Sequence, residues 1–79
     1  MSVTVAVRLN GPLAERLGAR RSMALPDGAT ADDLVQALRG EAAVELPAVA
    51  VSVGGRVVGG ATSLADGDEV AVLVPYAGG

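Results

Sequence analysis

The sequence ends with two glycines, Gly78 and Gly79, which follow a strand-like run and the segment Pro75-Tyr76-Ala77. A terminal glycine pair places a carboxylate on a segment without side chains. Such a segment can enter a narrow active site in another protein, where the carboxylate can be activated. Glycine fills 11 of 79 positions, so a shuffled sequence ends in two glycines in about 2% of cases, the square of 11/79. The glycine pair indicates a function only if the rest of the chain forms a scaffold that presents it.

The composition removes several other kinds of chemistry. The sequence contains no Cys and no His, which excludes disulfides, a thiolate nucleophile and the usual zinc or iron ligand sets. All six basic residues are arginine, so no lysine side chain can accept an isopeptide bond from another copy of the chain. The net charge is −3, there is no basic stripe, and the sequence contains only one aromatic residue. These features argue against nucleic-acid binding.

The length and the apolar residues predict one small domain. A chain of 79 residues rarely divides into two domains, and it buries only about 60–65% of its unfolded surface. Phe, Trp and Ile are absent, so Val, Leu and Ala must form the core. The start of the chain does not resemble a signal peptide, and no apolar stretch approaches the roughly 18 residues of a membrane span. We expect a cytoplasmic protein that does not contact membranes.

The first 25 residues predict two strands joined by a short helical turn. Apolar residues alternate over residues 3–9, and a weaker alternation follows over residues 21–25. Between them, an Asn-Gly-Pro segment at 10–12 interrupts the first strand, and residues 13–17 form about one helical turn that ends at Gly18. We expect the two strands to pair.

The next segment carries the signals of a longer helix. Thr30 can cap a helix start, and Asp33 three residues later completes a shortened capping box. Asp32 and Asp33 lie where carboxylates meet the positive end of the helix dipole, so we interpret them as helix-start acids and not as a catalytic pair. Gly40 is the predicted end of the helix. The predicted apolar stripe consists of Leu34, Ala37 and Leu38.

The second half of the chain predicts three more strands, over residues 49–53, 56–58 and 69–74, after an irregular connection over residues 41–47. Gly54-Gly55 supplies the positive φ angles of a two-residue hairpin. Leu64 is expected to pin a loop to the core, and Asp66-Gly67 to form a turn. The last strand is nearly all apolar, which is typical of a strand in the middle of a sheet.

These elements together predict the fold class. One helix and one apolar sheet face must bury each other, so the helix crosses that face. The residues predict an α+β domain over residues 1–74, in which one main helix crosses a mixed sheet of about five strands. A flexible tail over residues 75–79 follows, ending in Gly78-Gly79.

The order of elements resembles the β-grasp fold of ubiquitin-like proteins. In that fold the first and last strands are central and parallel, and the C-terminus projects from the sheet edge. The C-terminal part is more specific: Leu64, the Asp-Gly-Asp-Glu-Val run at 66–70, then Pro75 and Gly78-Gly79 resemble the MoaD/ThiS group of bacterial sulfur carriers.

The N-terminal part is similar to one branch of that group. Residues 13–18 form a leucine- and acid-containing turn that ends in glycine, as in the branch represented by the small subunit of molybdopterin synthase. That branch often has two prolines where this chain has Pro75-Tyr76, and usually has aromatic residues in its first and last strands. The strands of this chain have none, which leaves the identity of the partner open.

The resemblance implies a sulfur-donor co-substrate or non-catalytic small subunit, and not an enzyme. It implies that an E1-like adenylyltransferase/sulfurtransferase uses ATP and magnesium to join the Gly79 carboxylate to AMP, which sulfur then replaces to give a thiocarboxylate. Gly78 would keep the tail narrow, and Pro75, Tyr76 and Ala77 are candidate partner contacts. The implied acceptor is an enzyme such as the large subunit of molybdopterin synthase or a thiazole synthase. The chain itself is expected to bind no cofactor or metal.

Other residues permit a functional interpretation, but a structural one is simpler. Residues 66–68 could suggest a metal loop, yet a glycine before a strand favours a turn. Gly54-Gly55 and Gly59-Gly60 lack the lysine and the helix that follow in a phosphate-binding loop. The arginines Arg20, Arg21 and Arg56 are expected to be exposed. Tyr76 either anchors a partner or packs back onto the sheet.

Three classes of function remain open from the sequence. The leading hypothesis is a sulfur carrier, with molybdopterin as the nearest destination and thiamine, cysteine, methionine or a natural product as alternatives. A covalent protein modifier would instead form an isopeptide bond through Gly79. A non-covalent β-grasp interaction module would have an incidental glycine tail.

Overall fold

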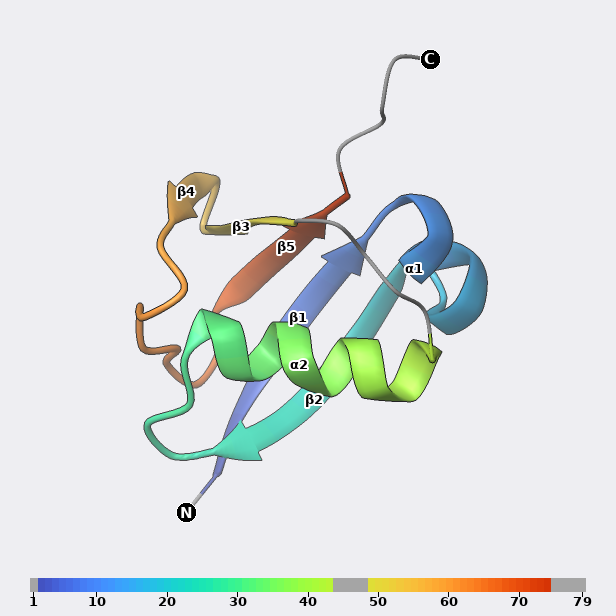
Figure 1. The fold of residues 1–79 in the computed structure, drawn as a ribbon. Helices are drawn as coiled ribbons and strands as arrows, with labels where there is room; N and C mark the ends of the chain where they lie inside the picture. The colour runs from blue at the N-terminus through green and yellow to red at the C-terminus, as the bar shows by residue number, and fades with distance from the viewer. Residues whose placement is uncertain (1, 44–48, 75–79) are drawn as a thin grey trace.

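The structure is a computed structural model that describes residues 2–43 and 49–74. Its strands are β1 (Ser2–Leu9), β2 (Arg20–Pro26), β3 (Ala50–Val53), β4 (Arg56–Val58) and β5 (Glu69–Leu73), and its helices are α1 (Gly11–Leu17) and α2 (Ala31–Ala42). The five strands form one mixed sheet, and α2 lies across one of its faces (Figure 1). This arrangement confirms the predicted α+β, β-grasp fold class.

The last strand lies in the middle of the sheet, as its apolar sequence predicts. The strand order is β2-β1-β5-β3-β4, with β1 parallel to β5 and the other neighbouring pairs antiparallel. Val70 and Val72 of β5 are 1% and 0% exposed and belong to the hydrophobic core. The parallel pairing runs from Ala6 opposite Glu69 to Leu9 opposite Val72.

The core lies between α2 and one face of the sheet. Burial alternates along β1, with every second residue from Val3 to Leu9 buried, as expected for a strand that packs on one face only. Leu34 and Leu38 of α2 and Leu13 of α1 cover that face and are at most 1% exposed. Leu64 pins the long loop before β5, as predicted, and its N–H donates to the carbonyl of Ala29 at 2.8 Å.

The start of α2 is as predicted, but its end is not. Thr30 accepts from the Asp33 N–H at 3.3 Å and donates its own N–H to the Asp33 carboxylate at 2.9 Å, so the capping box is complete. The helix continues past Gly40 to Ala42, and Ala43 caps it with a left-handed φ of 52°. Ala42 is 3% exposed and lies one turn after Leu38, so burial of this extra turn outweighs the helix-ending tendency of Gly40.

This extension also corrects two neighbouring predictions. Glu41 and Ala42 are helical and not part of an irregular connection, and residues 44–48 lie outside the described residues. Arg21 is not an exposed strand residue: its side chain is 26% exposed and pairs with the Glu41 carboxylate at 3.1 Å. It points to the helix side of β2, so it joins the edge of the sheet to the end of α2. Arg20 and Arg56 are exposed, as predicted.

The turns predicted at Gly54-Gly55 and at Asp66-Gly67 are both present. Gly54 and Gly55 have φ angles of 58° and 84° and join β3 to β4 in a tight hairpin. In the turn before β5, the Asp66 carboxylate accepts from the Thr4 N–H at 2.7 Å, and the Asp68 carboxylate accepts from the Ala65 N–H at 2.8 Å. Both carboxylates therefore satisfy backbone groups, which supports the interpretation of residues 66–68 as a turn.

Replacement of Leu34 or Val72 by Asp is expected to unfold the domain. Both side chains are 0% exposed, so a carboxylate there would be buried without a partner. That costs several kcal/mol, against about 4–12 kcal/mol of total stability for a domain of this length. Thermal unfolding followed by circular dichroism measures the effect. Val57→Asp is the matched control, since Val57 is 72% exposed; an unchanged melting temperature for Leu34→Asp would contradict the assigned core.

Candidate functional site

The predicted site residues Pro75, Tyr76, Ala77, Gly78 and Gly79 lie outside the described residues. The described part of the site is therefore its base, where β5 ends at Leu73 and the chain passes through Val74. The ends of the parallel strands β1 and β5 lie side by side at this point (Figure 1). The turn from β1 into α1 consequently borders the place where the tail begins.

Asn10 binds Val74 through both of its side-chain polar atoms. The Val74 N–H donates to Asn10 Oδ1 at 2.6 Å, and Asn10 Nδ2 donates to the Val74 carbonyl at 3.2 Å. The regular ladder between β1 and β5 ends at the Leu9–Val72 pair, because the backbone turns away at Gly11 with a φ of 56°. The Asn10 carboxamide thus takes the place of the backbone groups that β1 no longer supplies.

The hydrophobic core also holds Val74, through its side chain. Val74 is 9% exposed and belongs to the cluster that contains Leu9 and Leu13, which are 6% and 1% exposed. Burial of the Val74 side chain and the two hydrogen bonds to its backbone both oppose fraying beyond β5. The base of the tail is therefore fixed at Val74.

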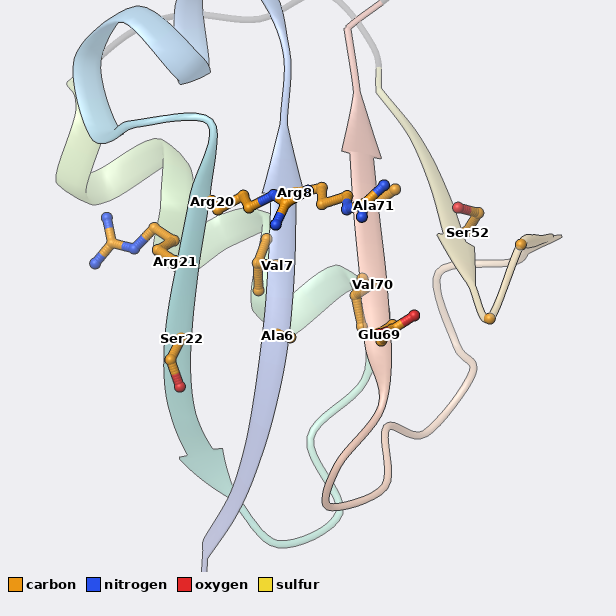
Figure 2. A pocket seen from close by; sticks show the side chains of 12 residues that line it. Ala6, Val7, Arg8, Arg20, Arg21, Ser22, Ser52, Glu69, Val70 and Ala71 are labelled. Carbon is orange, nitrogen blue, oxygen red and sulfur yellow. The ribbon is translucent and has the colours of Figure 1, made fainter.

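The sheet face opposite α2 forms an open groove near this base. Its floor consists of small side chains on neighbouring strands, among them Ala6, Ser22, Ser52 and Ala71 (Figure 2). Two arginines, Arg8 of β1 and Arg20 of β2, extend over this floor, whereas Arg21 points away from it (Figure 2). We call this surface, lined by the residues just named other than Arg21, and by Glu69 of β5, the outer face.

Arg8 and Arg20 occupy directly opposite positions in the antiparallel β1–β2 pair. Like charges in such positions destabilise a sheet. Within residues 2–43 and 49–74, the one ion pair closer than 4.0 Å joins Arg21 to Glu41, so neither Arg8 nor Arg20 has a carboxylate partner there. Two exposed guanidinium groups above a floor of small side chains can bind carboxylates of another protein.

The acidic side chains of the described residues do not gather at one point. The described residues contain no group of three acidic, His or Cys side chains that could hold a metal ion. Asp33 is engaged in the helix cap, and Asp32 is an exposed residue of the first turn of α2. No helix in the described part of the chain is long and apolar enough to cross a membrane.

Asn10 is the residue that the sequence interpretation missed. The Asn-Gly-Pro segment reads locally as a strand end followed by a helix start, and that is correct. Nothing local indicates a partner 64 residues later. The one available signal is that Asn carries its donor and its acceptor on separate atoms, whereas Asp only accepts and Ser and Thr donate and accept through one oxygen.

Comparison with solved structures gives close matches over nearly the whole chain. The Haloferax volcanii HVO 2177 protein is 32% identical, with a TM-score of 0.81, and the match covers 99% of this chain and 88% of that one. A putative molybdopterin converting factor subunit 1 from Pyrococcus furiosus is 28% identical, with a TM-score of 0.79, over 95% of this chain and 100% of that one.

A third similar structure contains a partner protein. It is the complex of subunits 1 and 2 of the molybdopterin-converting factor from Helicobacter pylori, which is 25% identical with a TM-score of 0.66, over 98% of this chain and 100% of that one. Comparison with curated protein sequences gives no match. The model of the ThiS family matches residues 7–79. The chain therefore belongs to the ThiS family, and its fold is the ubiquitin-like β-grasp.

Proposed function

We propose that this protein is a sulfur carrier whose Gly79 carboxylate becomes a thiocarboxylate and donates sulfur to a biosynthetic enzyme. The observation that carries the proposal is the ThiS-family match through residue 79, which includes both tail glycines. The fixed base at Val74 supports it, because a carrier must present its tail from a defined point.

The chemistry is activation followed by transfer, with catalytic groups supplied by partners. A carboxylate oxygen of Gly79 attacks the α-phosphorus of ATP in an E1-like enzyme, and magnesium pyrophosphate leaves. Sulfide then attacks the carbonyl carbon of the acyl adenylate and expels AMP, which leaves a thiocarboxylate. If an enzyme persulfide attacks instead, a thiol must afterwards cleave the S–S bond. Because the chain has no Cys, the sulfur cannot travel as a persulfide of its own.

The destination that we propose is molybdopterin synthesis, in the cytoplasm. One similar structure is a putative molybdopterin converting factor subunit 1, and another is the complex of subunits 1 and 2 of a molybdopterin-converting factor. By analogy, the tail of this chain would enter a larger catalytic subunit, and Pro75, Tyr76 and Ala77 would contact it. Co-purification of the acceptor enzyme distinguishes this destination from thiazole, cysteine or methionine synthesis.

The outer face is the surface that we propose for docking of the activating enzyme. The outer face has no aromatic side chains, so apolar contacts alone would bind a partner only weakly there. Its charged side chains are Arg8, Arg20 and Glu69, and the two arginines would meet carboxylates of the partner. The cost of placing Arg8 opposite Arg20 is then offset when the partner binds.

Incubation with ATP, magnesium, sulfide and the activating enzyme from the same organism is expected to replace one oxygen of Gly79 by sulfur. Intact-mass measurement and fragmentation of the C-terminal peptide check this. A variant with extra residues after Gly79 is the control: it is expected to fold normally and to gain no sulfur, since the Gly79 carboxyl group is then part of a peptide bond and is no longer terminal.

Two results would contradict this proposal. The first is sulfur transfer by the extended variant with its extension still attached. The second is a wild-type protein that gains no sulfur from an enzyme shown to be active on another carrier. Thiol-resistant, high-mass adducts that require Gly79 would identify a covalent modifier instead. Unchanged function after deletion of Gly78 and Gly79 would identify an interaction module.

Arg20→Glu is expected to stabilise the protein and to weaken its binding to the activating enzyme. The variant replaces repulsion with attraction opposite Arg8, which contributes about 0.2–1 kcal/mol to the free energy of unfolding. It also reverses a charge of the docking surface, so we expect about a tenfold higher Kd at low salt. Urea unfolding and calorimetric titration measure the two effects.

Arg56→Glu is the matched control for Arg20→Glu. It makes the same change in net charge on the exposed hairpin, where Arg56 lies opposite Val53. We expect it to leave both quantities nearly unchanged. Equal effects of the two variants would mean that net charge, and not the Arg8–Arg20 pair, determines stability and binding.

A further inference from the structure

Asn10 occupies the N-cap position of α1 but does not cap the helix. Its φ and ψ angles of −132° and 174° are those of an N-cap residue, and Asn is among the most favourable residues there. No hydrogen bond joins its side chain to the first turn of α1. The carboxamide instead binds the N–H and the carbonyl of Val74. The Asn10 side chain therefore binds a residue 64 positions away and makes no hydrogen bond to its own helix.

Asn fits this contact, and few other residue types do. The carboxamide is chemically a peptide group: its oxygen accepts from the Val74 N–H, and its NH2 donates to the Val74 carbonyl. Asp could accept but not donate, and Ser is shorter, although both are good N-caps. A residue selected only to start α1 would not need a donor.

We propose that Asn10 is a positioning residue for the reaction at Gly79, because it fixes the point from which the tail leaves the sheet. This inference rests on the proposed function. Five residues, 75–79, follow the fixed point, and fully extended they span at most about 18 Å. With so short a reach, the position of Val74 limits the region that the Gly79 carboxylate can occupy.

We expect loss of the Asn10–Val74 contact to lower the rate of the chemical step and to leave the affinity for the activating enzyme nearly unchanged. The Asn10 side chain is partly buried between the two segments it joins, so its loss leaves the outer face intact. A displacement of about 1 Å in a reacting group can lower the rate about 100-fold. Loss of the two hydrogen bonds should therefore lower kcat for adenylation by at least tenfold, while the Kd for the activating enzyme changes by less than about twofold.

The test uses the full chain and the variants Asn10→Ser and Asn10→Asp. Ser can still cap α1 but reaches neither polar group of Val74. Asp keeps the hydrogen bond from the Val74 N–H but places its second carboxylate oxygen against the Val74 carbonyl oxygen, which repels it. We expect both variants to lower kcat for ATP–pyrophosphate exchange, by at least tenfold in Asn10→Ser. Amide hydrogen exchange at Val74 is an independent readout, and it should be fastest in Asn10→Ser.

Thr30→Ala is the control for a loss of stability alone. It removes the capping box of α2, away from Val74, and so destabilises the fold without touching the base of the tail. We expect it to leave kcat and the relative protection of Val74 unchanged. Equal losses of kcat in Thr30→Ala and Asn10→Ser, compared at equal fractions folded, would overturn the positioning role.

The outcomes separate this inference from the function on which it rests. If wild type is adenylated and Asn10→Ser has the same kcat although Val74 exchanges faster, the hydrogen bonds exist but do not position the tail. If Val74 exchanges equally in both, the contact itself is absent in solution. If wild type is never adenylated by a competent enzyme, the proposed function fails first, and the positioning role fails with it.

Discussion

The parallel pairing of β1 with β5 is the constraint on which the rest of the structure depends. Because the two strands run in the same direction, their C-terminal ends meet at one edge of the sheet, where Leu9 pairs with Val72. The chain must turn away after β1, whereas it continues outward after β5. The turn into α1 therefore always lies beside the base of the tail, and a side chain in that turn can hold the tail in place.

A core without Phe, Trp or Ile explains why the two faces of the sheet differ so strongly. Val and Leu side chains are modest in size, so α2 and one sheet face must use nearly all of them to bury enough apolar surface. Few remain for the outer face, which carries Ala and Ser with two arginines and Glu69. Partner recognition on such a face must depend more on charge than on apolar area.

Local patterns predicted the elements that local interactions form. Alternation identified β1, the Thr30–Asp33 spacing identified the start of α2, and a glycine pair identified the hairpin at 54–55. The errors arise where distant packing overrides a local tendency: burial of Ala42 extends α2 past Gly40. Of the candidate site, the sequence supplied the tail residues but not Asn10, because its partner is 64 positions away.

Two of the departures from local rules in the described residues lie close together, whereas the left-handed Ala43 lies at the far end of α2. Arg8 faces Arg20 although like charges repel, and two residues later Asn10 leaves its helix uncapped. Both lie at the C-terminal end of β1, beside the last residues of β5. Natural sequences retain such conflicts mainly where function requires them. Their shared location favours, independently of any relative, the proposal that this protein works at the end of the sheet from which β5 leaves.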